Sequence, residues 1–154
     1  MQKNIIKSIC LNGLFAALYV TLVIMFGDLS FGFSGYISLR IAELLIAICI
    51  FDKRFIFGAI VGCFLANLYG GQVIDIIVGT IQSSITVLIL YYLKNKQLAV
   101  FLGSLACGVI IGCELVALGF SAIGYWIILT VFLGEYIILQ IGYQLAKRYY
   151  VLIK

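Results

Sequence analysis

Four of the six acidic residues lie inside long apolar stretches of the sequence, where an ionised side chain is rarely found. They are Glu43, Asp75, Glu114 and Glu135. A carboxylate in such a segment is costly, and these residues usually face the interior of a helix bundle or a water-filled cavity. Each can hold a proton, pair with a cation or accept hydrogen bonds from a ligand with several N–H groups. They are therefore the first candidates for a binding site.

Four further polar residues accompany the acids. Arg40 lies three residues before Glu43, at contact distance on a helix, and for this pair alone we favour a structural ion pair over a binding role. Amide side chains both donate and accept hydrogen bonds, which suits the edge of a heterocycle. The chain offers three of them near the acids: Asn67, Gln72 and Gln82. With up to four carboxylates against one guanidinium, this set predicts a small, flat, neutral or cationic solute rich in N–H groups.

The composition indicates that the elements carrying these residues lie in lipid. Of the 154 residues, 65% are hydrophobic and only 10% are charged, whereas a soluble domain has about 25% charged and 45–50% apolar residues. The sequence has no histidine, no phosphate-binding G-x-x-x-x-G-K-[ST] loop and no C-x-x-C spacing among its five cysteines. We therefore expect neither an enzyme nor a metal or cofactor site.

Charged and glycine-bearing breaks predict an all-α integral membrane protein with six transmembrane helices in a single domain, residues 1–154. The apolar segments cover residues 5–26, 39–51, 55–69, 73–93, 98–120 and 124–146. The second and third are short for an apolar core of about 30 Å, so they recruit flanking residues or line an aqueous cavity. Nine of the ten basic residues fall on one side of this topology, which predicts cytoplasmic termini and a multi-pass protein of the plasma membrane. This charge pattern is a topology signal, so we expect no nucleic-acid partner.

Periodicity places several candidates on shared helix faces in the outer half of the bundle. Asp75, Gly79, Gln82 and Thr86 recur every three or four residues and form one stripe. Glu114 shares a face with two small residues of its segment, whereas Trp126 lies opposite Glu135 and is expected at the membrane interface. We infer a polar cavity that opens to the outside. Three aromatic residues are positioned to stack on a planar ligand, although packing is the favoured role for each: Tyr36, Phe64 and Tyr69.

Small residues spaced four apart allow helix backbones to touch, either inside the bundle or against a partner. Such pairs are Gly13/Ala17, Gly58/Gly62 and Gly108/Gly112. For each pair, packing within the bundle is the favoured interpretation.

Three short motifs occur in order along the chain: "RIAEL" at 40–44, "GCFLAN" at 62–67 and "DIIVGT" at 75–80. Together with the "NGLFAALYV" pattern of the first segment, they resemble the QueT family. Members of that family are the substrate-binding S components of energy-coupling factor (ECF) transporters for queuosine precursors.

The resemblance implies that the ligand is a 7-deazaguanine-type base and that Arg40, Glu43, Asn67 and Asp75 belong to the binding region. It also implies that the Gly13/Ala17 face docks on a membrane coupling subunit, which works with two ATPase subunits. Two alternatives stay open for transport: an S component for another vitamin-sized solute, and a self-sufficient ion-coupled carrier with Glu114 or Glu135 as its coupling site. A structural or assembly subunit is a third.

Overall fold

Long helices dominate the chain, as the apolar segments predict. The computed structural model describes residues 2–27, 40–119 and 124–153, and these ranges contain no β-strand. The elements are α1 (Gln2–Phe26), α3 (Glu43–Ile46), the 3-10 helices η1 (Ala47–Ile50) and η2 (Lys53–Phe55), α4 (Ile56–Gly70), α5 (Val73–Tyr92), α6 (Lys96–Ala117) and α7 (Gly124–Ile153). Four of them, α1, α5, α6 and α7, are long and apolar enough to cross a membrane.

Local sequence explains where several helices begin and end. The Asn95 side chain accepts a hydrogen bond from the backbone N–H of Leu98 and caps the start of α6. Asp52 caps η2 in the same way, accepting from the backbone N–H of Arg54 at 2.9 Å. Helix α4 ends at Gly70 and is capped by Gly71, whose φ of 76° is a left-handed conformation that favours glycine.

The segment predicted as a membrane helix over residues 39–51 differs from that expectation. Only α3 is α-helical there, and the chain continues as the tighter η1 before it turns at Phe51. Together α3 and η1 extend about 14 Å, roughly half of an apolar core. Helix α4 is also short, at about 22 Å. The two short segments were recognised from the sequence, whereas a regular helix over 39–51 was wrong.

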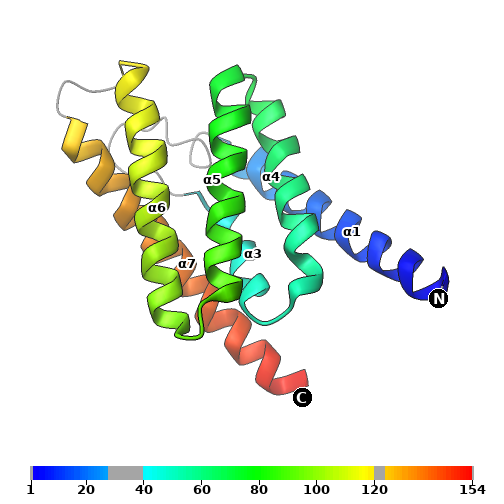
Figure 1. Ribbon diagram of the computed structural model, residues 1–154. Helices are drawn as coiled ribbons and strands as arrows, with labels where there is room; N and C mark the ends of the chain where they lie inside the picture. The colour runs from blue at the N-terminus through cyan, green and yellow to red at the C-terminus, as the bar shows by residue number, and fades with distance from the viewer. Residues whose placement is uncertain (1, 28–39, 120–123, 154) are drawn as a thin grey trace.

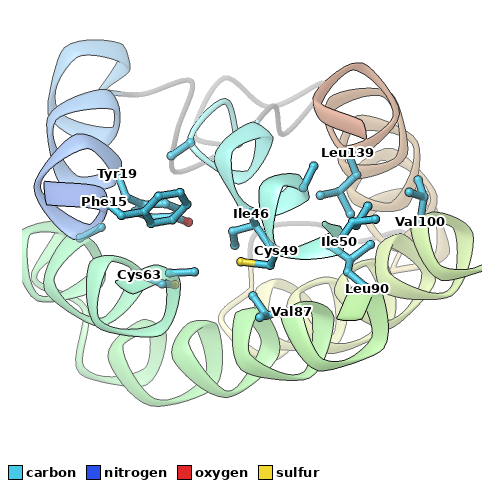
Figure 2. Close-up of a cluster of buried hydrophobic side chains, with 14 of the residues drawn as sticks. Phe15, Tyr19, Ile46, Cys49, Ile50, Cys63, Val87, Leu90, Val100 and Leu139 are labelled. Atoms are coloured by element: carbon cyan, nitrogen blue, oxygen red, sulfur yellow. The ribbon is translucent and has the colours of Figure 1, made fainter. Parts of the chain in front are cut away.

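The long helices form a curved wall around the short segment. Neighbours in this wall are α7, α6, α5, α4 and α1, in that order, and α3 with η1 fills the concave side (Figure 1). Figure 2 shows Ile46, Cys49 and Ile50 of this segment at the centre, with side chains from the surrounding helices directed toward them. Ile46 and Cys49 have no exposed surface. The short segment is therefore the core element of the bundle.

The distribution of polar and apolar side chains is the reverse of that in a soluble protein. Large apolar side chains are exposed on the outer faces, for example Phe57 at 69% and Ile77 at 58%, while Glu43 and Gln82 are fully buried. A fold with apolar residues outside and polar residues inside suits a lipid environment. The buried polar residues are consequently the part of the molecule that requires a functional explanation.

Candidate functional site

Glu43 is the central acid of the buried polar cluster. It occupies the first turn of α3, and its Oε1 atom accepts hydrogen bonds from the Ser83 hydroxyl at 2.9 Å and the Tyr19 hydroxyl at 3.2 Å. Ser83 comes from α5 and Tyr19 from α1, so this one oxygen joins three elements. Its second oxygen, Oε2, has no hydrogen-bond partner among the described residues. Glu43 thus retains free acceptor capacity.

Arg40 is held chiefly by α5. Its Nη1 donates to Oε1 of Gln82 at 3.0 Å and lies 3.8 Å from Oε1 of Glu43. Gln82 in turn donates from Nε2 to the Thr86 hydroxyl at 3.0 Å. The predicted Arg40–Glu43 ion pair is confirmed, but the shorter bond goes to Gln82. The guanidinium is therefore fixed from two sides while it neutralises the acid.

Asn67 enters the same cluster from α4. Its side chain is 97% buried, and its Nδ2 donates to the Thr80 hydroxyl at 3.4 Å. The absence of a side chain at Gly79 creates this space, because a Cβ built there would lie 2.7 Å from Nδ2 of Asn67 and 3.5 Å from Nη2 of Arg40. The predicted stripe of α5 is confirmed for Gly79, Gln82 and Thr86, all of which are buried.

Glu114 and Glu135 add two more buried carboxylates from α6 and α7. Glu114 is 7% exposed and Glu135 only 1%. All four of their carboxylate oxygens lack a hydrogen-bond partner within the described part of the chain. Glu135 interacts electrostatically with Glu43 and Arg40, and Glu114 with Asp75 and Arg40. Both acids therefore belong to the same electrostatic site as the α3–α5 network.

The remaining two candidates lie at the edge of this cluster. Gln72 and Asp75 are half-buried at the start of α5, with Asp75 one turn before Gly79. The structure thus joins Arg40 directly to Glu43 and Gln82, and links Asn67 to them through Cys63 and Ser83. Glu114 and Glu135 lie close enough to interact electrostatically with Arg40. Gln72 and Asp75 stay apart from this network, at the start of α5.

Sequence reasoning missed two hydroxyl groups of the cluster, and the aromatic candidates lie outside it or outside the described residues. Tyr19 and Ser83 bond to Glu43. Tyr19 is a single hydroxyl in an apolar run and gives no periodic signal, whereas Ser83 lies in the polar "TIQSSIT" stretch and could have been found from its spacing to Gly79 and Thr86. Phe64 and Tyr69 are 42% and 62% exposed on α4, which gives no support to stacking, the less favoured role for these two rings. Tyr36 lies outside the described residues. Trp126 is 53% exposed, on a different face from Glu135 as predicted.

The three pairs of small residues separate into two kinds. Gly58 and Gly62 pack against α1, and Gly108 and Gly112 pack against Ile128 and Phe132 of α7, each with room for no Cβ atom. Packing within the bundle is therefore confirmed for these two pairs. Gly13 differs, because a Cβ there would meet nothing within 4 Å, and Ala17 is exposed as well. This face of α1 is open.

The chemical capacity of the cluster follows from its charge balance. Three buried acids, Glu43, Glu114 and Glu135, face one buried guanidinium, Arg40. Five of their carboxylate oxygens have no donor among the described residues. A buried acceptor without a donor costs about 1–3 kcal/mol, and more when it is charged. The arrangement therefore favours a ligand that brings N–H donors or positive charge.

Comparison with known proteins gives one finding. The model of one protein family, described as QueT transporter, matches residues 9–150, nearly the whole chain. No curated protein and no solved structure matches the chain significantly.

Proposed function

Because the chain belongs to the QueT transporter family, and is thus a multi-pass membrane transport protein, we propose that it is the substrate-capture subunit of an ECF-type importer. In this proposal it binds a queuosine precursor, a 7-deazaguanine-type base, in a polar cavity that faces outward. The observation that carries the proposal is the set of buried carboxylate oxygens that lack donors beside the Arg40–Gln82 pair.

The chemistry of a guanine-like edge fits these free acceptors. Such an edge presents a ring N–H next to an exocyclic amino group, and one carboxylate accepts from both in a bidentate manner. Glu135 and Glu114 have both oxygens available, and Glu43 has one. Asn67 and Gln82 add amide groups for the remaining polar atoms of the base. The planar ligand would thereby neutralise the excess of buried acceptors.

The proposed coupling partners are a membrane subunit and two ATPase subunits, with α1 as the docking helix. Support comes from the open Gly13/Ala17 face, since the other two small-residue pairs are occupied by internal packing. The Gly13→Leu variant should reduce co-purification with the coupling subunit while ligand binding is kept. Val109→Leu, on the exposed face of α6, is the matched control. Equal co-purification of both variants would contradict this docking face.

Equilibrium binding of 7-deazaguanine bases to the purified subunit tests the ligand assignment. We expect tight binding by the wild type and a weakening of about tenfold, or 1.4 kcal/mol, for Asp75→Asn, whose charge neighbours Glu114. Asp52→Asn makes the same chemical change outside the polar cluster, in the capped turn before η2, and should bind like the wild type.

The alternatives give different results in the same system. A folded protein that ignores deazapurines but binds a vitamin-sized solute remains a substrate-capture subunit with another ligand. Uptake that persists without the ATPase subunits and collapses with the ion gradient would identify a self-sufficient carrier and refute the proposal.

A further inference from the structure

A groove of about 450 Å³ lies between the 44–55 segment and the C-terminal part of α7. Its volume is within the range of about 300–1,000 Å³ that is typical of ligand sites. All of its lining residues are apolar, glycine or aromatic except Asp52 and Arg54, which belong to the capped turn at η2. The polar cluster described above contributes none of these residues, so the groove is a separate feature.

Close contacts fix the two walls of the groove. Gly142 lets α7 approach α3 so closely that a Cβ there would lie 2.5 Å from the backbone oxygen of Leu44. Below this contact, Phe51 stacks on Tyr143 and Tyr150, which are two turns apart on α7, with ring centroids 5.9 and 5.3 Å away. Helix α7 then continues beyond the end of the bundle (Figure 1). The walls are therefore built independently of any occupant.

Basic residues are concentrated in the two segments that form the groove. Arg54 lines it, and three further basic side chains flank it in sequence and are exposed: Lys53, Lys147 and Arg148. The acid in the lining is already neutralised, because Asp52 and Arg54 form an ion pair of 2.6 Å between Oδ2 and Nη2. In this pair Nε and Nη2 of Arg54 donate to Asp52, and Nη1 takes no part. The two segments thus carry four basic residues against one acid, and Arg54 brings one basic group into the lining itself.

We propose that this groove binds an anionic phospholipid, with one acyl chain in the apolar channel and the phosphate at the basic residues. An acyl chain matches a channel of apolar and aromatic side chains, and a phosphate pairs with Arg and Lys. Basic pockets between membrane helices on the cytoplasmic side commonly bind acidic headgroups. Exposed tyrosines such as Tyr149 are typical of the same interfacial depth. The occupant is thus a lipid of the surrounding membrane, independent of the transported solute.

Native mass spectrometry of the full chain from nanodiscs with equal amounts of phosphatidylglycerol and phosphatidylcholine tests this proposal. The wild type should retain phosphatidylglycerol preferentially. Ala146→Phe fills the channel from α7 and should abolish the retention of that lipid. Arg54→Gln should lower the preference for phosphatidylglycerol about fivefold, as expected for one basic residue near an acidic lipid. Lys94→Gln removes an exposed basic residue from another connection and should leave the preference unchanged.

Three results would overturn the proposal. The first is equal retention of the two lipids by the wild type. The second is a folded Ala146→Phe protein that retains phosphatidylglycerol as the wild type does. The third is the same loss of preference in Lys94→Gln as in Arg54→Gln, which shows only a diffuse charge effect. If Ala146→Phe instead blocks assembly with the coupling subunit and leaves lipid retention intact, the groove is a protein-docking surface.

Discussion

The same substitution, glutamate to glutamine, should have opposite effects on stability at Glu43 and Glu135. Neither oxygen of Glu135 has a hydrogen-bond partner in the described part of the structure, although the side chain is 99% buried. Glutamine keeps the shape and removes a group that is costly to bury when ionised. Glu135→Gln should therefore leave the ligand-free protein equally stable or more stable.

Glu43→Gln should destabilise the protein instead. Its carboxylate accepts from Tyr19 and Ser83 and faces Arg40 at 3.8 Å. Loss of the negative charge weakens both hydrogen bonds and leaves the buried guanidinium with only the neutral Gln82 acceptor. Hydrogen bonds to charged groups contribute about 1.5–3 kcal/mol each, so the expected loss is about 2–3 kcal/mol.

Ligand binding should separate the two variants further. If a donor of the base reaches Glu135, its replacement by an amide removes one charge-assisted bond, and the dissociation constant should rise by about 10- to 100-fold. Thermal unfolding in detergent, with and without ligand, measures both effects on the same samples. Equal or greater apo stability with weakened binding supports a ligand-facing Glu135. A strong loss of apo stability in Glu135→Gln, or unchanged affinity, would refute the reasoning.

Two further predictions concern packing and charge. Gly79→Ala places a Cβ 2.7 Å from Nδ2 of Asn67, so the amide must move and ligand affinity should fall by about tenfold. Equal affinity of the Gly79→Ala and wild-type proteins in equilibrium binding would contradict this. Gly13→Ala, in contrast, meets nothing within 4 Å and should stabilise α1 by up to about 1 kcal/mol. Hydrogen bonds from Arg54 lower the pKa of Asp52 below its usual range. The contribution of the Asp52–Arg54 pair to the free energy of unfolding is therefore fully present above the unfolded pKa of about 3.9, and it is lost as the pH falls through the lowered value. Asp52→Asn should therefore cost at most about 1 kcal/mol at pH 7 and nothing at the acid end, and a constant difference across a pH series of unfolding measurements would disprove the assignment.

The stripe on α5 could be predicted from the sequence because helical periodicity alone places Gly79, Gln82 and Thr86 on one face. The burial of Glu114 and Glu135 followed from the high cost of a carboxylate in an apolar segment. Both arguments use only local spacing and composition, which a single sequence contains.

Contacts between helices were beyond this reasoning. The bond from Arg40 to Gln82 joins residues that are distant in the chain, and the Arg40–Glu43 spacing drew attention to the nearer partner instead. The irregular 41–50 segment was also missed, because its apolar residues fit a regular helix equally well. Its actual shape depends on the surrounding helices, since η1 packs against both α5 and α7.

The central position of α3 and η1 has a consequence for biogenesis. A segment of about 14 Å that begins with Glu43 and is preceded by Arg40 is a poor candidate for independent insertion into lipid. Its polar groups are satisfied by Tyr19 of α1 and by Gln82 and Ser83 of α5. Helix α7, which packs on α3 and η1 and adds Glu135 to the cluster, is synthesised last of the described helices. Gly142 of α7 closes directly on Leu44. The polar centre is therefore assembled only after translation has reached α7, so nascent chains that lack this helix should be unable to hold a ligand.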